Sequence, residues 1–282
     1  MHEHDRDESI VNIAGYKFVD LPDFECLRDP IKTRCAELGL LGTILLSPEG
    51  INVMLAGPRD AIEVIKQTLY DDARLADLAF KESFTAAPPF GRLLVKLKKE
   101  IISFGINGVD PARFTGPHIT PAELKRWYDE GRDFVVLDTR NDYEYRLGTF
   151  ENAIDPQIGG FREFPDAVRA LPEAYKDKPV VMFCTGGVRC EKASPFMLGE
   201  GFKQVFQLEG GILKYFEDVG GDHWVGECFV FDERVGLTPD LKASGALVCP
   251  ACQSAVTVEE QQSPDYVPGE RCPHCATSRH SA

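Results

Sequence analysis

Short apolar runs alternate with amphipathic stretches between about residues 15 and 105. The runs predict strands over residues 16–21, 42–46, 51–56 and 78–84, and the amphipathic stretches predict helices over 23–38 and 59–70. Ser47-Pro48-Glu49-Gly50 has the composition of a hairpin turn between the second and third strands. The order strand, helix, strand, strand, helix, strand predicts an α+β ferredoxin-like domain, the split βαβ arrangement.

A second pattern begins after a connecting region rich in proline and glycine. Thr120-Pro121-Ala122-Glu123 predicts a helix start, with Thr120 as the cap and Pro121 in the first position. Short β-branched runs then predict strands over residues 134–137, 179–183 and 205–208, with helical segments between and after them. This alternation is typical of a parallel α/β sheet flanked by helices. We therefore expect a ferredoxin-like domain and linker at residues 1–112 and an α/β domain at residues 113–223.

The periodicity fades after Trp224, so hydrophobic burial alone does not organise residues 224–282. This extension contains two Cys-x-x-Cys knuckles, Cys249-Pro250-Ala251-Cys252 and Cys272-Pro273-His274-Cys275, separated by nineteen residues. Four thiolates at this spacing predict a closed, structural zinc site, with His274 as a bystander. Disulfides are the alternative. The odd total of nine cysteines argues against them. Cys26, Cys35 and Cys228 lack partner spacing and are expected in the core.

Charge and hydropathy bear on location and partners. The 282 residues carry a formal net charge of −14, so any contact with nucleic acid requires a local basic patch. No run approaches eighteen apolar residues and the first ten are mostly polar, which predicts a cytoplasmic protein with no membrane segment.

One basic patch lies on a single predicted strand, in the segment Arg92-Leu93-Leu94-Val95-Lys96-Leu97-Lys98-Lys99. Alternation places Leu93, Val95 and Leu97 on one side and Arg92, Lys96 and Lys98 on the other. Arg92, Lys96, Lys98 and Lys99 are therefore candidates for contact with the phosphates of a nucleic acid. A solvated edge strand protected by lysines is the alternative reading.

The strongest chemical signal is Cys184, which ends an apolar strand and precedes a glycine-bearing turn and a helix. The loop Cys184-Thr185-Gly186-Gly187-Val188-Arg189 can curl its N–H groups toward one point, and Arg189 adds a fixed positive charge. Such a cradle binds an anion and lowers a thiol pKa, which suits a nucleophilic thiolate or a cysteine persulfide. A structural cysteine in a tight turn is the alternative.

Several neighbours of this loop are candidates for supporting roles. Cys190 could resolve an oxidised or persulfidated Cys184 as a disulfide, or could merely pack. Asp138, Arg140 and Glu144 follow an apolar strand and could serve the site or form only a charge network. Ser194-Pro195 predicts either a kinked helix or a helix that starts there with Ser194 as its cap.

These residues resemble the rhodanese domain in order and spacing: Val136-Leu137-Asp138-Thr139-Arg140, then Glu144, Gly148 and Ala153, and the Cys184 loop about forty residues on. Rhodaneses carry sulfane sulfur on such a cysteine. The resemblance implies that Asp138, Arg140 and Glu144 are supporting residues.

A wider resemblance covers nearly the whole chain. Its segments are Gly42 to Leu46, Glu49 to Asn52, Lys98 to Ile101, Leu147 to Ile154, Phe161 to Pro165, Glu209 to Ile212 and Cys228 to Val235. Together with the Cys184 loop, they are similar to the tRNA uridine hydroxylase family.

The wider resemblance implies a tRNA-modifying oxidoreductase that converts the wobble uridine, position 34, to 5-hydroxyuridine. It implies dioxygen as a co-substrate, a requirement for the loop cysteine, and tRNA as the partner. No nucleotide or flavin fingerprint is evident in the sequence. A thiosulfate or persulfide sulfurtransferase and a non-catalytic RNA or protein adaptor are the alternatives.

Overall fold

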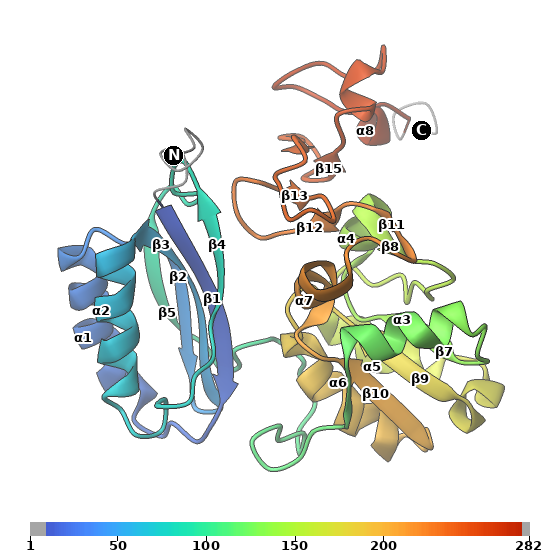
Figure 1. Ribbon diagram of the computed structural model, residues 1–282, viewed down its shortest axis with the longest axis horizontal. Helices are drawn as coiled ribbons and strands as arrows, with labels where there is room; N and C mark the ends of the chain where they lie inside the picture. Colours follow the sequence, from blue (N-terminus) through green and yellow to red (C-terminus); the bar gives the residue numbers. More distant parts are fainter. Residues whose placement is uncertain (1–9, 278–282) are drawn as a thin grey trace, which may run out of the picture. The chain divides into compact units, whose positions relative to one another are not determined.

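The computed structural model describes residues 10–277 and divides into two compact units, Met1–Ser103 and Phe104–Ala282, which are treated separately (Figure 1). Residues 1–9, which contribute to the expected localisation, lie outside the described residues. No helix of the described part is long and apolar enough to cross a membrane.

The first unit is a sheet covered on one face by two helices (Figure 1). Its elements are β1 (Ile10–Phe18), α1 (Phe24–Glu37), β2 (Leu41–Ser47), β3 (Gly50–Pro58), α2 (Arg59–Tyr70), β4 (Lys81–Thr85) and β5 (Leu93–Leu97). The sheet order is β4-β1-β3-β2-β5, antiparallel except that the edge strand β5 runs parallel to β2. The first four strands and the two helices form the predicted ferredoxin-like arrangement, which is confirmed.

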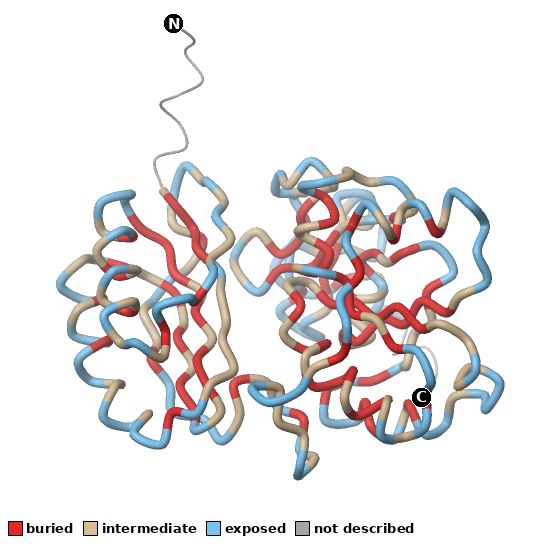
Figure 2. Tube along the Cα trace, turned by 60° about the horizontal axis from the view of Figure 1, so that its bottom comes forward, coloured by how far each residue is buried: buried red, intermediate tan, exposed pale blue. Residues whose placement is uncertain are grey.

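The core of this unit explains why its first strand differs from the prediction, and the fourth strand, predicted over residues 78–84, begins only at Lys81. Val11, Ile13, Ile44, Val53 and Leu55 are buried in one apolar cluster. Figure 2 shows buried positions along the strands of this unit. The first strand was predicted at residues 16–21 but begins at Ile10, because Val11 and Ile13 continue the alternation on the other side of Gly15. The expectation of a core position for Cys26 is wrong, since it is exposed, whereas Cys35 and Cys228 are buried.

The second unit contains the predicted parallel sheet, with strand order β6-β10-β9-β7. Its elements are β6 (His118–Ile119), α3 (Pro121–Asp129), β7 (Val135–Asp138), α4 (Asp142–Leu147), β8 (Gly148–Phe150), η2 (Phe161–Glu163), α5 (Phe164–Arg169), η3 (Glu173–Asp177), β9 (Pro179–Phe183), α6 (Val188–Gly199), β10 (Gln204–Leu208), α7 (Gly211–Val219) and β11 (Trp224–Gly226). Helices α3 and α7 pack together, as do α5 and α6. The hydroxyl of Thr120 accepts a hydrogen bond from the Glu123 N–H at 3.2 Å, so the predicted cap is present.

Helix α6 continues through Pro195 rather than starting there. A proline at this position supplies no N–H to the carbonyl four residues earlier, that of Glu191. The Thr115 hydroxyl donates to the Glu191 carbonyl at 3.3 Å, and the Ser194 hydroxyl accepts from the Gly116 N–H at 2.9 Å. The segment before β6 therefore supplies the one hydrogen bond that the proline removes and a second contact at Ser194. Helix α6 keeps its N-terminus at the Cys184 loop.

The C-terminal extension of the second unit consists of short elements: β12 (Cys228–Phe229), β13 (Gly236–Leu237), β14 (Leu247–Val248), β15 (Ala255–Val256), η4 (Glu260–Gln262) and α8 (Pro273–Thr277). It is anchored on α4, where Leu147 packs with Phe229, Val235, Ala246 and Ala255. The extension is therefore packed against the α/β body through a small apolar cluster of its own.

Candidate active site and four-cysteine cluster

Cys184 lies directly after β9, at the carboxyl end of the parallel sheet. The loop that follows curls because Gly187 adopts φ 102°, a conformation that side-chain-bearing residues rarely adopt. The Gly187 N–H points at the Cys184 sulfur, with an N···Sγ distance of 3.1 Å. Gly187 is also the N-cap of α6, so the helix begins at the loop. One N–H group of the predicted cradle, that of Gly187, therefore donates to the sulfur.

The surroundings of Cys184 favour its thiolate. Burial opposes ionisation, but a hydrogen bond from Cys190, the charge of Arg189 and backbone N–H groups of Arg189 and Gly187 outweigh it and lower the pKa of Cys184 to about 6. Burial and the neighbouring Cys184 raise the pKa of Cys190 well above its ordinary value. Cys190 therefore remains a thiol that can donate to the Cys184 anion, and its own sulfur lies 3.7 Å from the Thr139 hydroxyl.

Arg189 is held by Glu144, across the loop. The two guanidinium nitrogens Nη1 and Nη2 lie 3.3 and 2.6 Å from the two carboxylate oxygens, and both side chains are buried. Glu144 also accepts a hydrogen bond from the Asn141 N–H at 3.1 Å. Breaking such a buried pair by removing one partner costs about 3–5 kcal/mol, because the other charge is left unpaired. Glu144 therefore fixes the position of Arg189 beside Cys184.

Asp138 and Arg140 form a second buried ion pair, with Nη2 and Oδ2 2.6 Å apart. Arg140 donates further to the Gly148 carbonyl at 2.6 Å, and the Thr149 hydroxyl donates to Asp138 at 3.1 Å. These bonds join the end of β7 to β8. The pair thus supports the backbone on which α4 and Glu144 lie, and neither side chain has a hydrogen bond to the loop within residues 10–277.

Gly211, at the start of α7, is a site residue that the sequence did not single out by function. The N–H groups of Ile212 and Leu213 donate to the carbonyls of Cys184 and Thr185 at 3.0 and 3.2 Å. A Cβ atom on Gly211 would lie 2.7 Å from the Thr185 carbonyl oxygen and 2.9 Å from the Gly187 nitrogen. Its φ of +68° also favours glycine. Glycine here allows α7 to approach and brace the loop.

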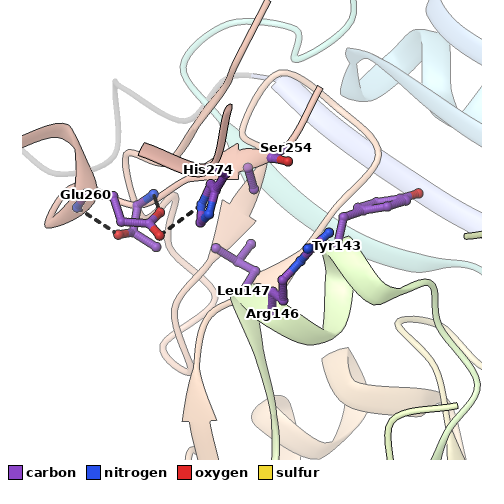
Figure 3. A pocket seen from close by; sticks show the side chains of 8 residues that line it. Tyr143, Arg146, Leu147, Ser254, Glu260 and His274 are labelled. Carbon is purple, nitrogen blue, oxygen red and sulfur yellow. Dashed lines mark hydrogen bonds and ion pairs between the residues drawn. The ribbon is translucent and has the colours of Figure 1, made fainter. Parts of the chain in front are cut away.

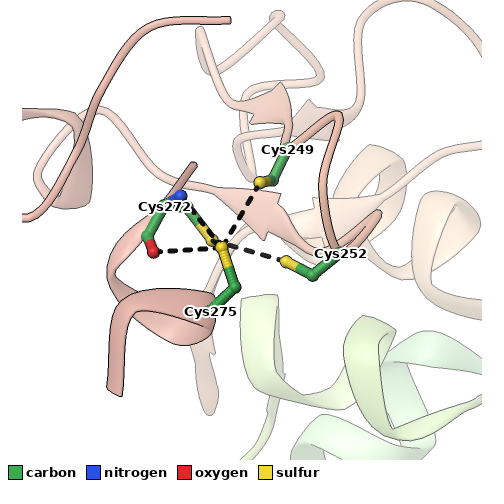
Figure 4. A group of neighbouring side chains, drawn as sticks. All are labelled: Cys249, Cys252, Cys272 and Cys275. Carbon is green, nitrogen blue, oxygen red and sulfur yellow. Dashed lines mark hydrogen bonds between the residues drawn. The ribbon is translucent and has the colours of Figure 1, made fainter. Parts of the chain in front are cut away.

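The four cysteines of the extension come together as one cluster (Figure 4). Their sulfur atoms all lie within 4.8 Å of one another, and the pairs Cys252–Cys272, Cys249–Cys275 and Cys272–Cys275 are separated by 3.5, 3.9 and 3.9 Å. Four sulfurs at about 2.3 Å from one zinc ion stand about 3.8 Å apart in a tetrahedron. The arrangement is compatible with a closed zinc site.

His274 lies beside this cluster but faces a different group. Its Nε2 atom is 2.9 Å from a carboxylate oxygen of Glu260. The two residues line a small pocket with Tyr143, Arg146 and Leu147 of α4 (Figure 3). The cysteine cluster and the helix that carries Glu144 are therefore neighbours in the same unit.

The basic residues of the first unit lie on and just beyond the edge strand β5. Val95 is buried toward the helices, whereas Arg92, Lys96, Lys98 and Lys99 are exposed. Leu97 departs from the expected alternation because it is 39% exposed at the end of the strand. Among the described residues, no ion pair involves any of the four basic side chains, so their charges are available to an anionic partner.

Comparisons with known proteins match this division of the chain. Residues 10–101 match the UPF0176 acylphosphatase like domain, and residues 120–218 match the rhodanese-like domain. Among solved structures, the chain is similar to a rhodanese-related protein from Thermoplasma volcanium, with 26% identity, a TM-score of 0.31, and coverage of 36% of this chain and 93% of that one.

Curated relatives match almost from end to end. A protein named tRNA uridine(34) hydroxylase from Cupriavidus taiwanensis is 54% identical over 278 residues, covering 97% of this chain and 99% of its own. One of the same name from Ralstonia nicotianae is 53% identical, covering 95% and 96%, and another from Burkholderia vietnamiensis is 47% identical, covering 97% and 100%. At this identity and coverage, the chain belongs to the tRNA uridine(34) hydroxylase family.

Proposed function

We propose that this protein is an oxidoreductase that hydroxylates the wobble uridine of tRNA at carbon-5, with Cys184 as the essential nucleophile and dioxygen as co-substrate. The observation that carries the proposal is sequence similarity over nearly the full length to relatives named for this reaction, with 54% and 53% identity. The Cys184 loop lowers the pKa of its cysteine, and the resulting thiolate is a suitable nucleophile for this reaction. The protein is expected in the cytoplasm, where tRNA is its substrate.

Uridine carbon-5 becomes reactive when a nucleophile adds to the neighbouring carbon-6. In the proposed step the Cys184 sulfur forms a bond to carbon-6, and the electron pair of the ring double bond moves onto carbon-5 and the carbonyl at position 4. Loss of the carbon-5 proton after oxygen insertion expels the sulfur and restores the ring. Inserting one atom of dioxygen requires two electrons from an external reductant, with the second atom leaving as water.

The loop residues have distinct roles in this proposal. The backbone N–H groups of the segment Thr185, Gly186, Gly187 and Val188, with the guanidinium of Arg189, stabilise negative charge on sulfur before attack and after release. Glu144 positions Arg189 through the buried ion pair. The Asp138–Arg140 pair supports the backbone of α4, which carries Glu144. Cys190 is positioned to protect an oxidised or persulfidated Cys184 as a resolving thiol.

A persulfide on Cys184 is a second form of the nucleophile that the site accommodates in this proposal. The residue is only 1% exposed. An added sulfur would extend about 2 Å beyond Sγ. The anion-binding loop favours a persulfide for the same reason that it favours a thiolate, and the persulfide would bring the reacting atom nearer to the substrate.

The remaining parts of the chain serve substrate binding and support. Arg92, Lys96, Lys98 and Lys99 would bind tRNA phosphates. Cys249, Cys252, Cys272 and Cys275 would hold a structural zinc ion, which leaves no open position for chemistry. In these terms the β5 edge of the first unit binds tRNA, whereas β4 lies at the opposite edge of that sheet. Residues 113–223 carry the reaction, and residues 224–282 support α4.

The test is nucleoside mass spectrometry on unmodified tRNA incubated aerobically with the purified protein and a thiol reductant. The expected result is a mass gain of one oxygen on uridine 34 that requires air and is absent with Cys184→Ala. The variant is checked for folding and zinc content. Hydroxylation that persists in a folded Cys184→Ala protein would contradict the role of the cysteine.

Sulfur transfer is the second candidate, because the Cys184 loop alone suits a persulfide carrier. A sulfurtransferase would release sulfide from thiosulfate in the presence of a thiol acceptor. Rapid release of this kind without any change in tRNA would favour it. An inert Cys184 in both assays would favour a non-catalytic adaptor.

A further inference from the structure

Phe231 is a large apolar side chain left open to solvent beside the reactive loop. Its exposed fraction is 48%, whereas Phe229, two residues earlier, is only 9% exposed. The guanidinium carbon of Arg189 lies 5.6 Å from the centre of the Phe231 ring. A single exposed aromatic residue is common, but this one shares a contact with the residue that faces Cys184.

A cluster of three aromatic rings fixes the position of Phe231. The Phe229 ring packs edge-on against Phe231 at 5.2 Å and against Tyr143 of α4 at 5.2 Å. The Phe229 carbonyl accepts a hydrogen bond from the Thr185 hydroxyl of the loop at 3.4 Å. Phe231 is therefore tied to the same loop and helix that position Cys184 and Glu144.

The turn between β12 and β13 holds Phe231 in place from the other side. The Val230 N–H donates to the Val235 carbonyl at 2.8 Å, and the Asp232 carboxylate accepts from the Arg234 N–H at 3.0 Å. Val235 has φ 60°, a conformation that β-branched residues rarely adopt. The surrounding structure must impose this unfavourable φ value on Val235, and such backbone strain is often found at ligand-binding sites.

We propose that the uracil of the wobble nucleotide stacks on Phe231 as it approaches Cys184. This inference rests on the proposed function and identifies the residue that receives the base. A nucleobase in an anticodon loop presents a flat π-face, and enzymes that modify single bases hold them between aromatic or apolar side chains. Phenylalanine offers no hydrogen bond to the base. It therefore contributes flat contact area, while other groups set the orientation.

The sequence provides a closely matched control. Phe84 on β4, in the other unit, is 47% exposed, and the guanidinium carbon of Arg59 lies 5.6 Å from its ring centre. It differs from Phe231 because the arginine beside it, Arg59, is not part of the Cys184 loop. Phe84→Leu therefore reproduces the loss of an exposed ring beside an arginine without touching the proposed base-binding position.

The experiment compares Phe231→Leu, Phe231→Trp and Phe84→Leu. Phe231→Leu keeps an apolar side chain but removes the stack, and kcat/KM for hydroxylation of a tRNA transcript is expected to fall about ten- to a hundredfold. Phe231→Trp should keep most of the activity, and Phe84→Leu should match the wild type. Equal activity of Phe231→Leu and wild type would overturn the inference while leaving the proposed function intact.

A binding measurement separates this inference from the proposed reaction. An anticodon stem-loop with a fluorescent pyrimidine at position 34 is titrated with Cys184→Ser protein, with and without Phe231→Leu. Stacking should change the fluorescence only when Phe231 is present, even if wild-type protein forms no hydroxylated product. If Phe231→Leu instead slows alkylation of Cys184 by iodoacetamide in the otherwise wild-type protein, the ring supports the loop and the inference fails.

Discussion

Gly211→Ala tests whether α7 and the Cys184 loop depend on close backbone contact. An alanine Cβ there would lie 2.7 Å from the Thr185 carbonyl oxygen and closer still to the Cys184 carbonyl oxygen. The two segments must therefore separate by more than about 0.7 Å to reach the 3.4 Å of ordinary van der Waals contact. The obstructing atoms are backbone, so no side-chain rotation relieves the clash. Displacing a reactive group by about 1 Å lowers rates by about 100-fold. We expect a hydroxylation rate reduced to that extent.

The same substitution should also lower the free energy of unfolding. Alanine in the left-handed region costs about 1–2 kcal/mol, and overpacking a close contact adds about 1–3 kcal/mol. The control is Gly131→Ala, which has a similar φ of +61° but no atom within 4 Å of its Cβ. Gly131→Ala should lower the free energy of unfolding only by the cost of placing alanine in the left-handed region, and it should leave the hydroxylation rate unchanged.

Tryptophan fluorescence during urea unfolding measures this stability, because Trp127 and Trp224 are both buried in the core of the second unit. Nucleoside mass spectrometry over a time course measures the rate. If Gly211→Ala unfolds at the same urea concentration as Gly131→Ala and hydroxylates tRNA at the wild-type rate, the close packing of α7 on the loop has no consequence and the reasoning is refuted.

Three further predictions follow from the site. Alkylation of Cys184 by iodoacetamide requires the thiolate, so its rate should fall as pH drops through about 6, and a midpoint near 9 would contradict the lowered pKa. Cys272→Ser should abolish binding of one zinc ion per chain, measured by elemental analysis, and reduce hydroxylation several-fold through loss of the support for α4; a zinc-free, fully active protein would refute that link. Lys96→Glu combined with Lys98→Glu should weaken tRNA binding and reduce its salt dependence by about two units of slope, whereas unchanged affinity would leave β5 as a protected edge strand.

The sequence predicted the elements whose signals are local. Strand β9 was predicted with its observed bounds, Pro179–Phe183, and the cap at Thr120 was identified, because a buried apolar run and a capping residue both act within a few positions. The grouping of the four cysteines was also predicted, because the spacing of two Cys-x-x-Cys pairs along the chain is enough to indicate a common metal site.

Features that depend on distant contacts could not be predicted from the sequence. The choice between a kinked and a late-starting α6 was left open, because the hydroxyl that caps the Glu191 carbonyl belongs to Thr115, 76 positions earlier. The role of Gly211 depends on how closely α7 approaches the loop, and the exposure of Phe231 depends on a turn held by Val235. A one-dimensional pattern contains none of these distances.

The anchoring of the C-terminal extension on α4 has a consequence for the timing of synthesis. Glu144 leaves the ribosome long before Ala255, the residue of the extension that packs beside Leu147. At about 5–20 residues per second, the interval between them is roughly 6–22 seconds. During that time the α/β body can form its sheet, but the apolar cluster on α4 is incomplete. Each new molecule therefore completes the support of its Arg189–Glu144 pair only late in translation.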